Sequence, residues 1–171
     1  MSNVLLVVDM LRGFLEEGHN LYCGDTAREI IPNVRTLIED QLALGSTIIY
    51  ICDSHESDDL EFQMFPIHCV KDTDEADLIP ELTGYPGDFV YKQRYSGFFN
   101  TDLGHTLEKL KPDNVIICGV CTDICVLHTA ADARNRDYNV SIPVDCVASF
   151  DYDAHEWAIN HMRSILGARL I

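Results

Sequence analysis

The sequence predicts an α/β protein of three layers, in which helices cover both faces of a central, mostly parallel sheet. Two observations lead to this expectation. Apolar runs of strand length alternate along the chain with longer segments whose apolar residues recur at helical spacing. The apolar runs are also continuous rather than alternating, which is typical of strands buried on both faces. A length of 171 residues suits one core, so we expect a single domain over residues 1–171.

The first half of the chain is expected to contribute three strands and one helix. The run VLLVVDM forms a buried strand that ends near Asp9. The segment TAREIIPNVRTLIEDQLALG follows as a helix, with Pro32 near its start and Gly45 as its stop signal. TIIYICD is then a second buried strand that ends in Asp53, and DFVYK is a third, shorter one that ends in Lys92.

The second half continues the alternation. DLGHTLEKLK is expected to be a short helix before the strand NVIICG, and GVCTDICVLHTAADA leads into a helix that reaches about Asn135. YNVSIPVD is another expected strand. The segment YDAHEWAINHMRSILG closes the chain as a helix, with apolar positions at Trp157, Ile159, Met162, Ile165 and Leu166.

The composition excludes several classes of function. The chain has 12 Lys plus Arg against 28 Asp plus Glu, a net charge of −16, so we expect no binding to nucleic acid or to anionic membranes. The apolar runs are shorter than the ~18 to 20 residues of a membrane-spanning helix. The N-terminal segment lacks the basic region of a signal peptide, which predicts a cytoplasmic protein whose 7 cysteines are mostly reduced.

Four predicted strands end in, or lead into, residues that could perform chemistry. Ligands of such sheets bind at the carboxyl ends of the strands, where Asp9, Asp53, Lys92 and the segment after Gly119 are expected to converge. Singly, Asp9 is more often a cap or turn residue and Lys92 an exposed lysine. Together with a cysteine they offer a carboxylate base, an ammonium group and a thiol nucleophile.

Cys125 is the strongest nucleophile candidate in GVCTDICVLHTAADA. It lies near the first turn of the predicted helix, which Thr122 is expected to cap, and unpaired N–H groups there lower the pKa of a thiol. Cys121 precedes the helix, where its backbone is better placed than its side chain to assist chemistry, and Cys118 is most simply core. A C-x2-C-x3-C metal knuckle is less favoured because it lacks a fourth ligand.

A metal site is predicted in the segment CDSHESDDLEFQMFPIHC. In extended backbone Asp53 and His55 point to the same side, and His68 follows later in the segment. A carboxylate with two imidazoles suits zinc, iron or manganese, and Glu61 could add a ligand. Loop histidines are usually surface residues, but the position at the end of a central strand favours the metal interpretation.

Three separated motifs resemble those of the isochorismatase-like cysteine hydrolase superfamily, and within it the nicotinamidase/pyrazinamidase group. They are VLLVVDMLRGF, YKQRYSGFFNTDL and GVCTDICVLHTAADA, and the DSH and HCV segments resemble the metal motif of that group. The resemblance spans nearly the whole chain. It implies the isochorismatase-like hydrolase fold and the hydrolysis of a small amide.

The resemblance also implies residue roles. Cys125 would be the nucleophile, Asp9 the general base and acid, and Lys92 the group that stabilises the thiolate. The backbone N–H groups of Cys121 and Cys125 would form the oxyanion hole, beside a cis peptide between Val120 and Cys121. The metal ligands would be Asp53, His55 and His68, and Glu61 lies near the position of an additional ligand in related enzymes. The walls of an aromatic pocket would be formed by Phe14, Phe65 and Tyr95.

The expected reaction is the conversion of nicotinamide to nicotinate and ammonia through a thioester, and pyrazinamide is expected as a second substrate. The implied cofactor is a divalent metal, zinc first, with iron or manganese as alternatives, and the implied pathway is NAD salvage. A homo-oligomer is expected from the resemblance. Two alternatives stay open: a related hydrolase of another amide, carbamoyl or ureido compound, and a non-catalytic member that binds a small molecule.

Overall fold

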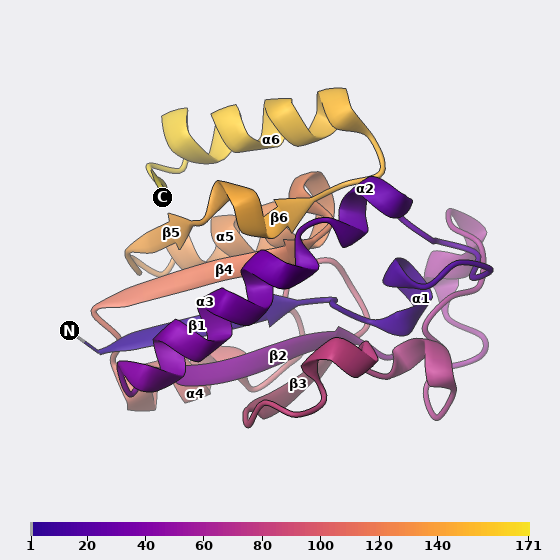
Figure 1. Cartoon of the computed structure of the whole chain (residues 1–171), viewed down its shortest axis with the longest axis horizontal. Helices are drawn as coiled ribbons and strands as arrows, with labels where there is room; N and C mark the ends of the chain where they lie inside the picture. The colour runs from indigo at the N-terminus through magenta and orange to yellow at the C-terminus, as the bar shows by residue number, and fades with distance from the viewer. Residues whose placement is uncertain (1) are drawn as a thin grey trace.

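The computed structural model describes residues 2–171 and is built around a parallel sheet of seven strands (Figure 1). The strand order is β3-β2-β1-β4-β5-β7, and β6 pairs with the end of β4. The expected three-layer α/β architecture is thereby confirmed. The strands are β1 (Asn3–Val8), β2 (Thr47–Asp53), β3 (Asp88–Lys92), β4 (Asn114–Val120), β5 (Val140–Ile142), β6 (Val147–Ala148) and β7 (Arg169–Leu170).

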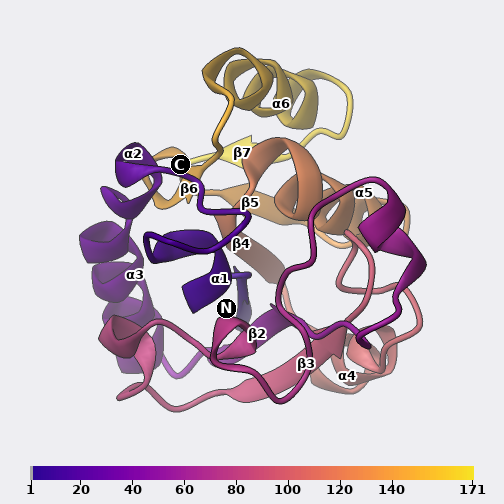
Figure 2. The ribbon, with the colours of Figure 1, turned by 90° about the vertical axis from the view of Figure 1, so that its right-hand side faces the viewer.

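Helices cover both faces of this sheet. Figure 2 shows α3 on one side and α4 and α5 on the other. No helix formed by residues 2–171 has the length and apolar character needed to cross a membrane. The α-helices are α1 (Arg12–Leu15), α2 (Asp25–Arg28), α3 (Ile31–Ala43), α4 (Leu103–Leu110), α5 (Leu127–Arg134) and α6 (Tyr152–Ser164). The 3-10 helices span Leu60–Gln63, Asp74–Ala76, Pro80–Leu82 and Val144–Cys146, and a π-helical turn spans Thr122–Val126.

The continuous apolar runs are explained by two cores, one on each face of the sheet. Along β1, Leu5 and Val7 pack into the core that contains α3, whereas Leu6 and Val8 pack into the core that contains α4, α5 and α6. Successive side chains of a strand point to opposite faces, so a strand covered on both sides needs apolar residues at every position. This arrangement fixes the central strands and therefore the edge where they end.

Prolines account for two differences from the expected elements. The helix after β1 is divided into α2 and α3, and Pro32 lies in the first turn of α3. A proline ring further inside a helix would clash with the carbonyl four residues earlier, so the helix begins anew. The single strand expected over residues 138–145 is wrong in extent, because β5 ends at Ile142 before Pro143 and a 3-10 turn leads to β6.

The face of α6 also differs from the expected one. Trp157 and Ile165 are 56% and 69% exposed, and the buried positions of the helix are Ala158 and Met162. Small Ala158 lets the helix lie close to its neighbours, which leaves the indole of Trp157 outside, stacked on the ring of His161 at 4.8 Å between centroids. Helical spacing identified the helix but not which apolar residues face the core.

Gly119 fixes the close approach of β4 to β1 and provides a test of the fold. Its φ is +110°, and a Cβ added there would lie 2.0 Å from the carbonyl oxygen of Val8. We expect Gly119→Ala to lower the free energy of unfolding by at least about 2 kcal/mol, because both the backbone conformation and the contact become unfavourable. Urea denaturation measures this change.

Gly104→Ala is the matched control, since this glycine lies inside α4 and an added Cβ would meet no atom closer than 3.9 Å. It should raise stability by roughly 0.5 to 1 kcal/mol through the lower entropy of the unfolded chain. Equal effects of the two substitutions would contradict the account of Gly119.

Candidate active site and metal centre

The carboxyl ends of four neighbouring strands gather the predicted chemical groups at one edge of the sheet. Asp9 follows β1, while Asp53 is the last residue of β2 and Lys92 the last residue of β3. Cys125 lies in the π-helical turn that follows β4. The strand order changes direction at the β1–β4 pair, and this kind of crevice binds ligands in open α/β sheets.

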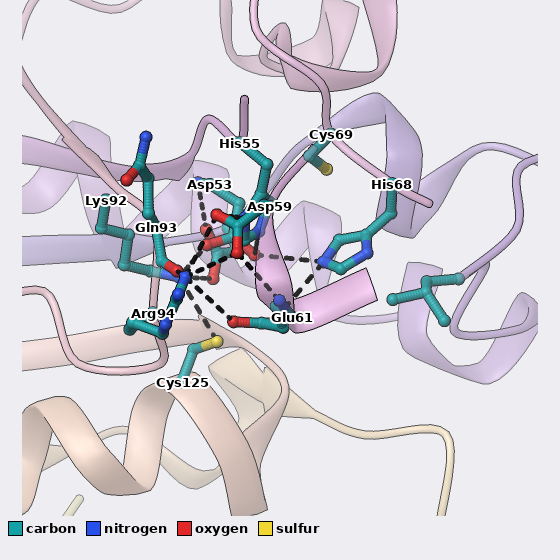
Figure 3. A network of polar contacts seen from close by, with 12 residues as sticks. Asp53, His55, Asp59, Glu61, His68, Cys69, Lys92, Gln93, Arg94 and Cys125 are labelled. Carbon is teal, nitrogen blue, oxygen red and sulfur yellow. Dashed lines mark hydrogen bonds and ion pairs between the residues drawn. The ribbon is translucent and has the colours of Figure 1, made fainter. Parts of the chain in front are cut away.

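Lys92 is at the centre of the first cluster of side chains. Its Nζ lies 2.8 Å from Asp9 Oδ2 and 3.4 Å from Cys125 Sγ, and it also donates a hydrogen bond to Asp53 Oδ1. Figure 3 shows Lys92 reaching toward Asp53 and Cys125. Asp9, Asp53 and Cys125 each offer an atom within 4.8 Å of the others, and all four side chains are buried. The structure thus brings a base, an ammonium group and a thiol into contact.

Burial determines the protonation of this cluster. It raises the pKa of Asp9 to about 6, with a further contribution from the charge of Asp53. Burial also raises the pKa of the Cys125 thiol well above its ordinary value, and the opposing effect of Lys92 does not cancel this, so the lowered pKa expected from the start of the helix is wrong. Burial by itself would lower the pKa of Lys92, but the charges of Asp53 and Asp9 keep it well above the ordinary value. At neutral pH Cys125 is therefore a thiol that needs a base, and Asp9 is adjacent.

The turn that carries Cys125 differs in one detail from the prediction. Cys121, not Thr122, occupies the position before the first helical residue, and it makes no side-chain cap. The Thr122 hydroxyl instead lies 2.8 Å from Nδ1 of His155 on α6, so the expected Thr122 cap is wrong. As predicted, Cys121 precedes the helical turn, and Thr122, as the first residue of the turn, directs its side chain toward His155. The expected cis peptide between Val120 and Cys121 is confirmed.

The other cysteines of this segment have structural surroundings. Cys118 is fully buried in the core, as predicted, and Cys121 Sγ lies 3.5 Å from Cys23 Sγ. All 7 cysteines are free. Within residues 2–171, the clusters able to hold a metal ion are Asp53 with His55 and His68, and Asp9 with Asp53 and Cys125. The disfavoured three-cysteine knuckle is not among them.

The second cluster contains the predicted metal ligands. The Nε2 atoms of His55 and His68 lie 3.6 Å and 3.9 Å from Asp53 Oδ2. Oε1 of Glu61 is 3.9 Å from His68 Nε2, a contact marked by a dashed line in Figure 3. All four side chains are buried. Two imidazoles and two carboxylates are a donor set suited to zinc, iron or manganese.

The hydrogen bonds of this cluster fit a bound cation. His55 Nδ1 is 3.0 Å from Asp59 Oδ2, and His68 Nδ1 is 2.7 Å from the carbonyl oxygen of Pro66. Both Nδ1 atoms therefore act as donors, which leaves the Nε2 lone pairs directed at the cluster. In the part of the chain that the structure describes, His55 Nε2 and Glu61 Oε2 are buried without a hydrogen-bond partner. Such orphaned atoms are costly unless a cation satisfies them.

An apolar cleft joins the two clusters. The predicted wall residues Phe14, Phe65 and Tyr95 line it together with Cys125 and His68. A larger cavity of about 700 Å³ lies against β3, but it holds neither Cys125 nor the two histidines, so size does not mark the site here. Val120, at the end of β4, also lines the cleft. Sequence reasoning missed three further lining residues: Ile124 in the π-helical turn, and Leu21 and Phe150 in connecting segments.

Sequence reasoning also missed Asp59 and Arg94, which contact the metal cluster. Asp59 bonds to His55, and Arg94 donates to both carboxylate oxygens of Asp59 at 2.9 Å and 3.1 Å. Asp59 lies in the acidic segment ESDD, where nothing in the sequence distinguishes it from Asp58. The position of Arg94 just after Lys92 was the only available signal.

Comparisons with known proteins show the family and the fold. The family model for the isochorismatase domain matches residues 3–170. The structure is similar to the nicotinamidase/pyrazinamidase of Bacillus subtilis, with 33% identity, a TM-score of 0.93 and coverage of 99% of both chains. It also resembles the pyrazinamidase of Pyrococcus horikoshii in complex with zinc, with 30% identity, a TM-score of 0.88 and coverage of 100% and 99%. A third match is the N-carbamoylsarcosine amidase of Thermoplasma acidophilum, with 32% identity, a TM-score of 0.89 and coverage of 99% and 95%.

Proposed function

Because the chain belongs to the isochorismatase family, we propose that it is a metal-dependent nicotinamidase that converts nicotinamide to nicotinate and ammonia. It is a hydrolase that acts on amide C–N bonds. One observation most supports nicotinamide as the substrate: two clusters of side chains meet at a single cleft. The first cluster is Asp9, Lys92 and Cys125, and the second consists of histidines and carboxylates suited to a metal. Pyrazinamide, which carries the same carboxamide on a nitrogen heterocycle, is the second expected substrate.

In the first step Asp9 takes the proton of the Cys125 thiol, and the thiolate attacks the carboxamide carbon. Lys92, at 3.4 Å from the sulfur, stabilises the thiolate. The backbone N–H groups of Cys121 and Cys125 are assigned to the developing oxyanion, an interaction worth a few kcal/mol for each donor. The C–N bond then breaks, and ammonia leaves with the proton from Asp9, so that a thioester remains.

In the second step water attacks the thioester carbon while Asp9 takes a proton from the water. The C–S bond breaks, nicotinate is released, and the Cys125 thiolate recovers its proton from Asp9. Asp9 acts as base and as acid in both steps. Burial raises its pKa to about 6, so this carboxyl group can both accept and return a proton near neutral pH.

Asp53, His55, His68 and Glu61 are the residues that would hold the divalent metal. When bound there, it would supply a Lewis acid for a ring nitrogen and for water. Zinc is the first candidate, supported by the similarity to a pyrazinamidase in complex with zinc, and iron and manganese suit the same donors. The rings of Phe14, Phe65 and Tyr95 are assigned to the walls of the substrate pocket.

A second candidate function is the hydrolysis of a carbamoyl or ureido compound. The similarity to an N-carbamoylsarcosine amidase favours it, since that protein differs in substrate while it shares the fold. A non-catalytic role is less favoured because the acid, the amine and the thiol are all present and in contact. We further propose a cytoplasmic homo-oligomer that acts in NAD salvage.

Ammonia release from nicotinamide, measured before and after metal removal, tests this function. The metal-loaded protein should hydrolyse nicotinamide, and extraction with a chelator should lower turnover at least tenfold because the ring nitrogen then loses its partner. Zinc, iron or manganese should restore the activity when added back. Turnover of N-carbamoyl substrates alone would establish the second candidate, and no ammonia from any substrate at full metal loading would contradict both.

A further inference from the structure

Asp59 is a buried carboxylate that contacts two of the assigned metal ligands without being one of them. Its side chain is 4% exposed. Oδ2 accepts the Nδ1–H of His55 at 3.0 Å, and Oδ1 accepts the backbone N–H of Glu61 at 2.9 Å. Figure 3 shows Asp59 between His55 and Arg94, above Glu61. One side chain therefore joins the two ligands that lie on different parts of the loop.

We propose that Asp59, supported by Arg94, is a positioning residue that sets the geometry and the affinity of the metal centre. This inference rests on the metal centre of the proposed function. Asp59 acts by holding His55 and Glu61 in place, without contacting the metal or the substrate itself.

The bond to His55 fixes the orientation of an imidazole. With Nδ1–H donated to a carboxylate, the ring holds its Nε2 lone pair toward Asp53, and the negative charge behind the ring makes that nitrogen a stronger ligand. His68 differs, because its Nδ1 bonds to the neutral backbone carbonyl of Pro66. The basicity of His55 therefore depends on the side chain of Asp59, which a substitution can change, whereas that of His68 depends on a backbone group.

The bond to Glu61 fixes the second ligand through the backbone. Asp59 is the capping residue of the 3-10 helix Leu60–Gln63, and its side chain accepts the N–H of Glu61. Short helices of this kind have few internal hydrogen bonds, so the cap holds a large share of their geometry. Without it, the Glu61 side chain loses the fixed backbone that directs it toward His68.

Arg94 keeps Asp59 in the form that these bonds require. Its Nη1 donates to both oxygens of Asp59 and also lies 3.9 Å from Glu61 Oε2. The site already contains the carboxylates of Asp53 and Glu61, so a third buried negative charge needs a partner. The guanidinium provides that partner, and its hydrogen bonds to both oxygens hold the carboxylate where it accepts from His55 and from Glu61.

Metal affinity of the full chain, measured by competition with a chromophoric chelator, tests the inference. We expect Asp59→Asn to weaken Zn²⁺ and Co²⁺ binding by about 10- to 100-fold and to change the visible spectrum of the Co²⁺ form. Asp58→Asn, at the exposed neighbouring position, is the matched control and should bind both ions like the unmodified protein. Arg94→Gln should weaken binding less than Asp59→Asn does, and this half-exposed position keeps the test valid should Asp59→Asn fail to fold.

Urea denaturation of the metal-free proteins separates positioning from a merely structural role. A structural role would lower the stability of Asp59→Asn but leave the affinity and the Co²⁺ spectrum of the folded protein unchanged, and that result would overturn the inference. Normal Zn²⁺ affinity in a folded Arg94→Gln would overturn the part assigned to Arg94. If the unmodified protein binds metal but does not hydrolyse nicotinamide, the proposed function fails while the variant affinities still decide this inference. If it binds neither ion, both fail.

Discussion

Replacing Cys125 by alanine is expected to lower nicotinamide turnover by at least about 10⁴-fold, with the protein still folded and its metal retained. The thiol is the nucleophile of the proposed thioester route, and alanine offers no group that can form the intermediate. Cys125 is not one of the four residues assigned to the metal, and its hydrogen-bond partner is Lys92. Loss of turnover with an unchanged metal content would therefore separate the roles of the two clusters.

Steady-state ammonia release and metal analysis of the same samples provide this measurement. Cys146→Ala is the matched control, since this cysteine is equally buried but its thiol lies against Asp145, outside the cleft. It should keep most of its turnover. If Cys125→Ala lost less than about tenfold, direct attack by water would explain the reaction better than a covalent intermediate.

Topology explains why so much of the site could be predicted from one sequence. Because the chain alternates strands and helices, parallel strands were expected, and their carboxyl ends had to share one edge. Strands β2 and β3 have the predicted bounds and end in Asp53 and Lys92. The convergence of these residues with Asp9 follows from the strand order, although the residues are far apart in the sequence.

The unpredicted parts depend on loop paths and on very short elements. β6 and β7 have two residues each, too few for any periodic pattern. The contact of Asp59 with His55 depends on how the acidic segment turns back, and the contact of Thr122 with His155 joins a turn to a distant helix. Composition and spacing describe neither path. Such contacts need the three-dimensional arrangement of segments that share no local signal.

Replacing Lys92 by methionine is expected to lower the free energy of unfolding by about 3 to 5 kcal/mol, the usual loss when one partner of a buried ion pair is removed. Lys92 is fully buried, lies 2.8 Å from Asp9 and donates a hydrogen bond to Asp53. Methionine has a similar length and fills the same space, so the loss comes from the charge. Two buried carboxylates would then face each other without an ammonium group between them.

Urea denaturation at neutral pH measures this loss, and nicotinamide turnover should disappear in the same variant because the thiolate loses its counter-ion. Lys109→Met, on the exposed side of α4, is the control and should change stability by no more than about 0.5 kcal/mol. A small effect of Lys92→Met would mean that solvent reaches these carboxylates, against the buried cluster described above.

A second substitution distinguishes electrostatic destabilisation from lost packing. In the Lys92→Met background, Asp9→Asn removes one of the two carboxylates that have lost their partner, and part of the lost stability should return. Asp9→Asn alone should destabilise, because it leaves Lys92 with one carboxylate instead of two. This reversal of sign is what a coupled buried charge cluster predicts, and a double-mutant cycle measures it directly. Simple additivity of the two substitutions would indicate that the charges of Lys92 and Asp9 do not stabilise each other in the folded protein, against the buried ion pair described above.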